Sequence, residues 1–501
     1  MIERLKFFAG GEWIESKTQK YMDVYNPSTG EVIAQAPCCT SDEVKYAIEC
    51  ADKAYKQWKN VPPMKRAQIL FKVKQLIDEN IDELTLMVAK ENGKVLSEAY
   101  GDVLKAREVT ELACGIPTLM MGESIMDASS GYDTVLYREP LGVFAGIVPF
   151  NFPAMIPMGW MTPLCIAAGN TIVLKAASMT PMTCMKIAQL YKQAGLPDGV
   201  LNIVTCSRNE AEILLEHEKV KGVTFVGSTS IGKHIYQKCA SHGKRVQALC
   251  EAKNHALVLN DAVLERTAQG IVNAYCGCAG ERCMALPVVV AENGIADKLV
   301  ETLIDFSKKL KVGPAYHEES QLGPLVTKQH RDSVARWIEK GIEEGAKPVL
   351  DGRNIVVKGF ENGFYLGPTI LDYVTPEMSV GNCEIFGPVL CVKRVSSFDE
   401  GVELINANPF ANGAVIYTQN GYYAREFANR IHGGMVGVNV GIPVPISIFP
   451  FSGHKDSFFG DLHTLGKDGV RFYTETKVVT THWFKEKEKA RERVDTWDGT
   501  I

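Results

Sequence analysis

The stretch Gly142-Val143-Phe144-Ala145-Gly146-Ile147-Val148 is a short apolar run of the kind typical of a buried strand. It opens a region in which strand-like and helix-like segments alternate. The expected strands cover residues 142–148, 171–175, 200–205 and 222–226, and the expected helices cover residues 155–168, 182–194, 210–216 and 232–239. This alternation predicts a doubly wound parallel sheet, a fold that binds ligands, often dinucleotides, at the carboxyl ends of its strands.

A second α/β pattern begins near Lys253. Its expected elements are strands at residues 256–259, 389–395 and 414–417 and helices at residues 295–309, 332–345 and 398–406. Residues 131–139 and 474–481 are also strand-like, but neither has an obvious partner nearby in the sequence. The chain is therefore predicted to hold two α/β domains and a smaller β element.

Composition excludes several classes of protein. The chain has 501 residues, 46% of them hydrophobic and 23% charged, with a formal net charge of −5, so nucleic acid is not an expected partner. No apolar run reaches the ~18 residues of a membrane span, so no membrane partner is expected. The 14 cysteines have no regular spacing, which predicts a reducing, cytoplasmic location. Cys276-Gly277-Cys278 and Cys38-Cys39 lack a second ligand pair, so no metal is expected.

The stretch Ala279-Gly280-Glu281-Arg282-Cys283-Met284-Ala285-Leu286 lies between a helix-like run at 267–275 and a strand-like run at 287–291. Such a junction can present one side chain at the bottom of a cleft. We interpret Cys283 as a nucleophile whose thiolate attacks an aldehyde. The alternative is a small buried packing residue, which is what most intracellular cysteines are.

Several motifs resemble the aldehyde dehydrogenase superfamily in order and spacing. They are Pro149-Phe150-Asn151-Phe152-Pro153, Lys175 before Thr180-Pro181, Phe225-Val226-Gly227-Ser228-Thr229-Ser230-Ile231-Gly232, the Cys283 motif and Glu384-Ile385-Phe386-Gly387-Pro388. Other stretches, above all Ser457-Phe458-Phe459-Gly460-Asp461-Leu462-His463, are similar to the CoA-acylating methylmalonate-semialdehyde (malonate-semialdehyde) dehydrogenases. The resemblance runs nearly end to end.

The resemblance implies a role for each matching residue. Cys283 would be the nucleophile, and Asn151 with the Cys283 backbone N–H would stabilise the oxyanion that forms. The positions matching the cofactor site are Val148, Phe150, Lys175, Ser178, Met179, Gly227, Ser228, Gly232, Cys250, Glu384 and Phe386. The implied cofactor is NAD. NADP is not excluded, because Ser178 stands where a carboxylate would repel a 2′-phosphate.

The implied substrate is a small aldehyde that carries a carboxylate. Arg282 adjoins the nucleophile and would bind that carboxylate together with Lys105 or Arg107, where the family has an arginine near position 105. Lys105 alone would more commonly be a solvated helix residue. Glu251 stands where a small residue is expected.

The implied acyl acceptor is CoA. In hydrolytic aldehyde dehydrogenases a glutamate activates water, and its position here is Leu249, which cannot take a proton. A hydrolytic enzyme remains the alternative, with Glu251 as a replacement base, and a non-catalytic protein on the same scaffold is a further one.

The implied organisation has three parts. The NAD-binding domain is assigned to residues 1–124 and 143–252, the catalytic domain to residues 253–445, and small β oligomerisation segments to residues 125–142 and 464–501. The two strand-like segments without local partners predict sheet pairing in an oligomer, with a homotetramer implied by the family.

Overall fold

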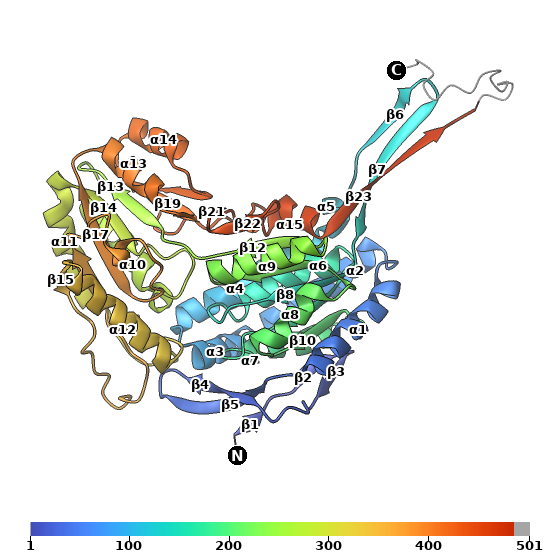
Figure 1. Cartoon of the computed structure of the whole chain (residues 1–501), viewed down its shortest axis with the longest axis horizontal. Helices are drawn as coiled ribbons and strands as arrows, with labels where there is room; N and C mark the ends of the chain where they lie inside the picture. The colour runs from blue at the N-terminus through green and yellow to red at the C-terminus, as the bar shows by residue number, and fades with distance from the viewer. Residues whose placement is uncertain (1, 485–501) are drawn as a thin grey trace.

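The computed structural model describes residues 2–484, so the end of the segment assigned to residues 464–501 lies outside the described residues. Its main body is built on two sheets of mostly parallel strands flanked by helices, and a narrow arm projects from that body (Figure 1). The predicted α/β fold class is confirmed. None of the described helices is long and apolar enough to cross a membrane.

The first sheet has eight strands in the order β22-β12-β11-β8-β9-β10-β2-β3. The strands are β2 (Phe7–Ala9), β3 (Glu12–Ile14), β8 (Val143–Ile147), β9 (Thr171–Lys175), β10 (Leu201–Val204), β11 (Val220–Val226), β12 (Arg245–Leu249) and β22 (Phe458–Gly460). Its helices are α1 (Ser41–Trp58), α2 (Pro63–Glu79), α3 (Ile81–Asn92), α4 (Leu96–Cys114), α6 (Thr162–Ala167), α7 (Met182–Gln193), α8 (Arg208–Glu216) and α9 (Thr229–Ser241). The five central strands are parallel. All four strands predicted here from the alternating pattern are present.

Side chains and local helix geometry set the starts of two helices. Thr40 caps α1: its hydroxyl accepts from the Glu43 N–H, and the Glu43 carboxylate accepts from the Thr40 N–H. The single helix expected over 155–168 begins as a π-helix, Ile156–Met161, before α6. In this wider turn the Thr162 hydroxyl donates to the Pro157 carbonyl oxygen at 2.7 Å.

The second sheet has seven strands in the order β15-β16-β17-β14-β13-β19-β20. They are β13 (His255–Val258), β14 (Val288–Glu292), β15 (Lys347–Leu350), β16 (Thr369–Asp372), β17 (Val389–Val395), β19 (Gly413–Tyr417) and β20 (Met435–Val438). The accompanying helices are α10 (Leu264–Cys276), α11 (Asn293–Lys308), α12 (Lys328–Glu343), α13 (Phe398–Ala407) and α14 (Gly421–Arg430). The first helix predicted after residue 320 was placed at 332–345, whereas α12 begins four residues earlier at Lys328, where Thr327 caps it.

The arm is a three-stranded antiparallel sheet of β6 (Ser124–Ser129), β7 (Tyr132–Pro140) and β23 (Thr474–His482). The strand-like tail therefore pairs within its own chain, from Thr474 opposite Pro140 to His482 opposite Tyr132. Short elements complete the chain: β1 (Glu3–Arg4), β4 (Tyr21–Asn26), β5 (Glu31–Pro37), α5 (Ile116–Leu119), β18 (Phe410–Ala411), β21 (His454–Lys455), α15 (Gly466–Phe472) and the 3₁₀ turn Ser379–Gly381.

Candidate active site

The centre of the first sheet has the strand order β12-β11-β8-β9-β10. The chain adds β9 and β10 on one side of β8 and then adds β11 and β12 on the other side, so the order reverses between β8 and β11. In a doubly wound sheet this is the topological switch point, where a crevice opens at the carboxyl ends of the strands. The segments that leave those two ends carry Phe150 and Asn151 after β8, and Gly227 and Ser228 after β11. The sequence motifs for the oxyanion and the cofactor are thus brought to one edge of the sheet.

Cys283 lies in the connection between α10 and β14, as the sequence predicted. The backbone of this connection is held in an unusual form, with φ of 54° at Cys278, 51° at Ala279 and 74° at Gly280. A Cβ at Gly280 would lie 2.2 Å from the Gly387 carbonyl oxygen, so only glycine fits there. The Cys278 N–H donates to Glu98 Oε1 at 2.8 Å, which ties the connection to α4.

Cys283 borders two hollows that adjoin it from different sides. One is a cavity of about 170 Å³ whose apolar wall includes Phe152, Met155, Trp160, Ile442 and Phe451. The other is smaller and is bordered by Glu384, Phe386 and Ala252. A thiol in this position can meet an aldehyde on one side and a cofactor on the other.

Burial raises the pKa of the Cys283 thiol to about 12, and the charge of Glu384 adds to this shift. The thiol is therefore protonated near neutral pH in this state, and its attack on a carbonyl requires the proton to leave. Cys278 is fully buried and burial also raises its pKa to about 12, while Cys276 is buried within the core around the second sheet. Neither of these two cysteines borders the hollows beside Cys283.

Asn151 is buried next to the connection between α10 and β14 that carries Cys283, here called the nucleophile connection. Its Nδ2 donates to the Glu281 carbonyl oxygen at 3.0 Å, two residues before Cys283, and its Oδ1 has no partner among the described residues. One Nδ2 hydrogen remains for a second acceptor. The geometry is compatible with the predicted role of Asn151 as an oxyanion donor.

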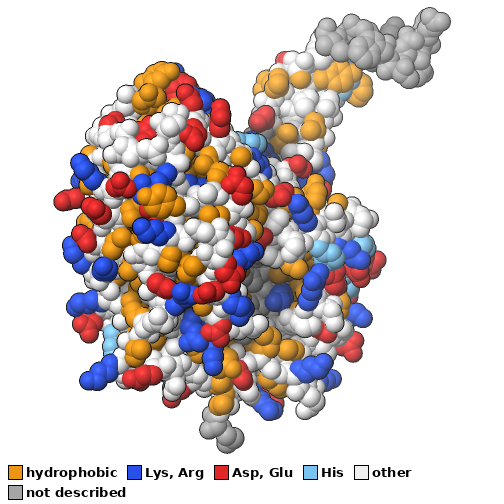
Figure 2. All heavy atoms as spheres, turned by 60° about the vertical axis from the view of Figure 1, so that its left-hand side comes forward, with side chains coloured by type: hydrophobic (Ala, Val, Ile, Leu, Met, Phe, Trp, Pro, Cys, Tyr) orange, Lys and Arg blue, Asp and Glu red, His pale blue; other side chains and the backbone are white. Residues whose placement is uncertain are grey.

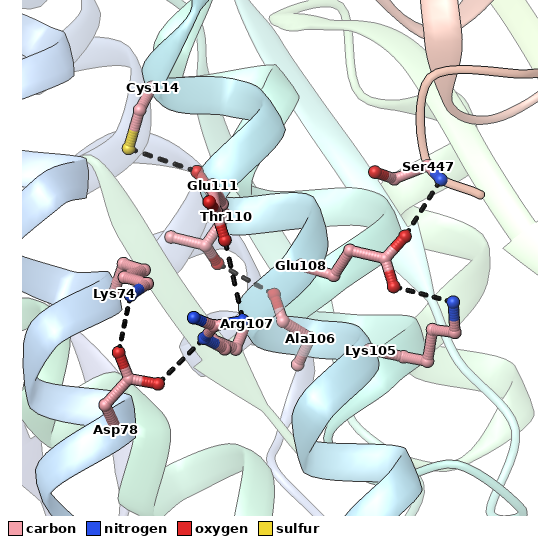
Figure 3. Close-up of polar contacts among 10 residues, drawn as sticks. All are labelled: Lys74, Asp78, Lys105, Ala106, Arg107, Glu108, Thr110, Glu111, Cys114 and Ser447. Atoms are coloured by element: carbon pink, nitrogen blue, oxygen red, sulfur yellow. Dashed lines mark hydrogen bonds and ion pairs between the residues drawn. The ribbon is translucent and has the colours of Figure 1, made fainter.

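Lys105 and Arg107 point away from each other on α4 (Figure 3). Lys105 borders the apolar cavity, and its Nζ lies 2.6 Å from Glu108 Oε2. Arg107 instead donates to Asp78 Oδ1 at 2.8 Å and lies 3.5 Å from Glu111. Arg107 does not border the cavity, because residues two apart on a helix point in nearly opposite directions. The structure thus brings only Lys105 of this pair to the site.

Arg282 borders the cavity through part of its side chain, but its guanidinium is held by the protein. Nη2 donates to the Asn273 carbonyl oxygen at 2.6 Å, whereas Nε is buried without a partner among the described residues. The Nε–H of Arg282 therefore has no acceptor among the described residues.

Glu384 and Phe386 lie in the segment before β17, and the Phe386 ring contacts Phe150 after β8. The Phe150 and Phe386 rings meet edge to face with centroids 5.9 Å apart, and Val148 is buried in the adjacent core. Glu384 Oε1 accepts from the Ala252 N–H at 2.9 Å, and its other oxygen has no hydrogen-bond partner among the described residues. Burial raises the pKa of Glu384 to about 8, and the nearby Glu251 charge raises it further against the opposing effects of the Ala252 N–H and Lys253.

The other predicted cofactor residues follow the strand ends of the first sheet. Lys175 ends β9, burial lowers the pKa of its ammonium, and this ammonium has no hydrogen-bond partner among the described residues. Ser178 is buried, whereas Met179 borders a separate open hollow near β4 and the start of α12. The ammonium of Lys175 at the end of β9 and the second oxygen of Glu384, which precedes β17 of the other sheet, are groups that suit the hydroxyls of a dinucleotide.

The turn into α9 is tightly packed. Gly232 lies on Cys250, since a Cβ at position 232 would sit 2.2 Å from Cys250 Sγ. Gly227 and Ser228 precede the first turn of the helix, where backbone N–H groups suit a phosphate. One feature does not fit a bare phosphate site: the Thr229 N–H already donates to Glu251 Oε2 at 3.0 Å.

Comparison with known proteins shows the family of this chain. The sequence model of the aldehyde dehydrogenase family matches residues 13–479. This chain belongs to the aldehyde dehydrogenase family. Within the family it is 48% identical over 482 residues to malonate-semialdehyde dehydrogenase 2 of Geobacillus kaustophilus, covering 96% of this chain and 99% of that protein.

Two solved structures of family members are similar over almost the whole chain. One, from Oceanimonas doudoroffii, is a methylmalonate-semialdehyde dehydrogenase, with a TM-score of 0.95, 42% identity, and coverage of 97% of this chain and 99% of that one. The other, from Sinorhizobium meliloti 1021, is assigned as a methylmalonate-semialdehyde dehydrogenase and is complexed with NAD, with a TM-score of 0.95, 40% identity and the same coverage.

Two residues of this aldehyde dehydrogenase escaped the sequence analysis, Glu98 and Glu108. Glu98 anchors the nucleophile connection, and Glu108 pairs with Lys105 and accepts from the Ser447 N–H at 3.0 Å (Figure 3). A signal for both exists: Glu98, Asp102, Lys105 and Glu108 are spaced by three or four residues, which places them on one face of a helix. Charged residues in such a row on a mostly buried helix point to a site.

Proposed function

We propose that this aldehyde dehydrogenase oxidises malonate semialdehyde or methylmalonate semialdehyde to acetyl-CoA or propionyl-CoA with loss of carbon dioxide, using NAD and CoA. The observation that carries the proposal is the position of Cys283 between the cavity that holds Lys105 and the hollow bordered by Glu384 and Phe386. The malonate-semialdehyde dehydrogenase similar to this chain supports the substrate, and the Sinorhizobium meliloti protein complexed with NAD supports the cofactor.

The chemistry begins with attack of Cys283 Sγ on the aldehyde carbon. The oxyanion of the resulting thiohemiacetal would accept from the second Asn151 Nδ2 hydrogen and from the Cys283 N–H. A nicotinamide dinucleotide bound here would supply the acceptor for the hydride on this carbon. Glu384 would hold a ribose through its free oxygen, and Lys175 would donate to another ribose. A thioester on Cys283 is left, its β-carboxylate leaves as carbon dioxide, and a proton from water takes its place on the α-carbon.

The proposal also names CoA, in place of water, as the acceptor of the acyl group. Leu249, at the position of a hydrolytic base, is buried and packs in the core near the first sheet. Without a general base, water attack on the thioester loses roughly the 10²–10⁴-fold that such a group supplies. A CoA thiolate needs no such base because a fraction of the thiol is ionised near neutral pH. It attacks the thioester carbonyl and releases the Cys283 thiolate.

Glu251 is the rival base, and its contacts speak against that role. Its carboxylate accepts from the Thr229 N–H, its own N–H donates to Thr229 Oγ1 at 3.3 Å, and its carbonyl accepts from Ser457 Oγ at 2.6 Å. The side chain and the backbone of Glu251 are thus bonded to the start of α9 and to Ser457 next to β22. The acidic group that acts most on the Cys283 thiol is Glu384.

Product analysis with malonate semialdehyde and NAD tests the proposal. Acetyl-CoA should form with CoA present, and turnover should slow sharply without it. Rapid CoA-independent release of free acid, abolished in Glu251→Gln, would refute CoA acylation and favour a hydrolytic enzyme. Comparison of kcat/KM for NAD and NADP tests the cofactor, and a strong preference for NADP would refute NAD.

We also propose a homotetramer in the cytoplasm. The arm carries exposed apolar side chains on β6 and β23, among them Ile125, Met126 and Val478, and Figure 2 shows hydrophobic side chains along it. Apolar side chains on a projecting sheet favour contact with another subunit. All fourteen cysteines are free in the structure, which supports a reducing compartment.

A further inference from the structure

The side chain of Glu251 caps the start of α9 from outside the helix, where an N-cap side chain would commonly do so. Ser228, at the N-cap position, makes no side-chain hydrogen bond to the helix. The Thr229 N–H donates instead to Glu251 Oε2 at 3.0 Å, and the Thr229 hydroxyl donates to the Asp456 carbonyl oxygen at 3.2 Å. A carboxylate from β12's end therefore satisfies an amide that a helix start otherwise offers to a ligand.

That amide lies in the turn predicted to hold the cofactor's pyrophosphate. The turn follows β11 at the switch point of the sheet, and the partial positive charge of a helix start favours an anion there. A bound pyrophosphate and the Glu251 carboxylate are both anions, so they compete for the same N–H and repel each other.

The surroundings do not neutralise Glu251. One nearby cation, Lys233 on α9, is 3.1 Å from Asp456 Oδ2 and is thus paired. Glu384 faces the same region, because the Glu251 charge acts on it, and Lys253 is fully buried with no hydrogen-bond partner for its ammonium among the described residues. Glu251 forms no ion pair among the described residues, so its charge is available to oppose a second anion.

We propose that Glu251 gates the dinucleotide site: its carboxylate holds the Thr229 N–H when no cofactor is bound, and it must leave this amide before the pyrophosphate can bind. Cofactor affinity is then lowered by the free energy of breaking that contact and by the like charge nearby. This inference rests on the proposed function only in taking a nicotinamide dinucleotide as the cofactor. It assigns Glu251 to binding, not to the activation of water.

Equilibrium binding of NADH, followed by its fluorescence, tests the gate in the full-length protein. Glu251→Gln keeps an oxygen for the Thr229 N–H and removes the charge, whereas Glu251→Gly removes both. Each variant should bind NADH roughly threefold to tenfold more tightly than the wild type, the range expected for a charge at a helix start with a nearby like charge. The affinity for ADP-ribose, which has the pyrophosphate but no nicotinamide, should rise by the same factor, and the affinity for adenosine should not change.

Glu212→Gln is the matched control, because Glu212 pairs with the flank of α9 through His234 at 2.7 Å and does not touch the first turn. Its affinity for NADH should stay at the wild-type value. The proposed gate is refuted if both Glu251 variants bind NADH with unchanged or lower affinity. It is also refuted if Glu212→Gln raises the affinity for NADH equally, or if the Glu251 variants raise the affinity for adenosine equally. If neither the wild type nor any variant binds NADH or NADPH, the proposed cofactor fails, and the gate with it.

Discussion

Replacing Glu108 by glutamine is expected to raise the preference of the enzyme for a carboxylated aldehyde. Glu108 Oε2 lies 2.6 Å from Lys105 Nζ, and its Oε1 accepts from the Ser447 N–H at 3.0 Å. Glutamine keeps an acceptor for Ser447 and so preserves the link between α4 and the opposite cavity wall. It removes the charge that neutralises Lys105 and that repels a substrate carboxylate.

The size of the effect follows from charge and exposure. Two unit charges about 6 Å apart at an effective dielectric constant of about 20 interact by roughly 3 kcal/mol. The Lys105 and Glu108 side chains are 39% and 28% exposed, so solvent and salt reduce this to about 1 kcal/mol. The kcat/KM for malonate semialdehyde should therefore rise about fivefold, while that for uncharged propionaldehyde should stay nearly constant.

The assay is NADH formation at 340 nm with each aldehyde, with CoA present. Glu111→Gln is the matched control, since Glu111 lies one turn further along α4, contacts Arg107 at 3.5 Å and does not border the cavity. An equal change for both aldehydes, or a decrease for malonate semialdehyde alone, would refute the idea that Glu108 competes with the substrate for Lys105.

Cys283→Ala should abolish dehydrogenase activity while NADH binding survives, and Cys276→Ala should leave both nearly intact; near-normal turnover in Cys283→Ala would exclude this nucleophile. Because the pKa of Glu384 is raised to about 8, its carboxyl is protonated below that pH and becomes a full acceptor above it. Affinity for NADH measured by fluorescence should therefore rise from pH 7 to pH 9, and Glu384→Gln should flatten this rise; an unchanged profile would remove Glu384 from the ribose site. The double variant Met126→Asp and Val478→Asp, at positions 81% and 60% exposed, should shift the mass measured by light scattering to smaller species, and a wild-type monomer would contradict the tetramer.

The sequence by itself determined the parts of this protein that depend on neighbouring residues. The alternation of apolar runs from residue 142 onward predicted four of the eight strands of the first sheet, because burial on both faces of a parallel strand requires a continuous apolar run. It also placed Cys283 between a helix and a buried strand, where the structure has α10 and β14.

Only the tertiary structure decided which of two nearby cations reaches the cavity. The sequence offered Lys105 and Arg107 equally, and helical geometry allows only one of them to face a given wall. The packing of α4 against the core and against the segment of Ser447 turns Lys105 inward and leaves Arg107 to Asp78. No local pattern contains this choice, because Ser447, which holds Glu108 beside Lys105, lies more than 300 positions away.

The same reason explains the pairing of β23 with β7 and the contact of Glu251 with α9. The tail looked unpartnered because its partner precedes it by more than 300 residues, and Glu251 looked unexplained because Thr229 lies on a different element. Helices and strands arise from short-range periodicity, whereas contacts between distant segments arise only when the core brings them together. In this protein the elements were readable from the sequence, and the neighbours of each charged side chain were set by the packing of the two sheets.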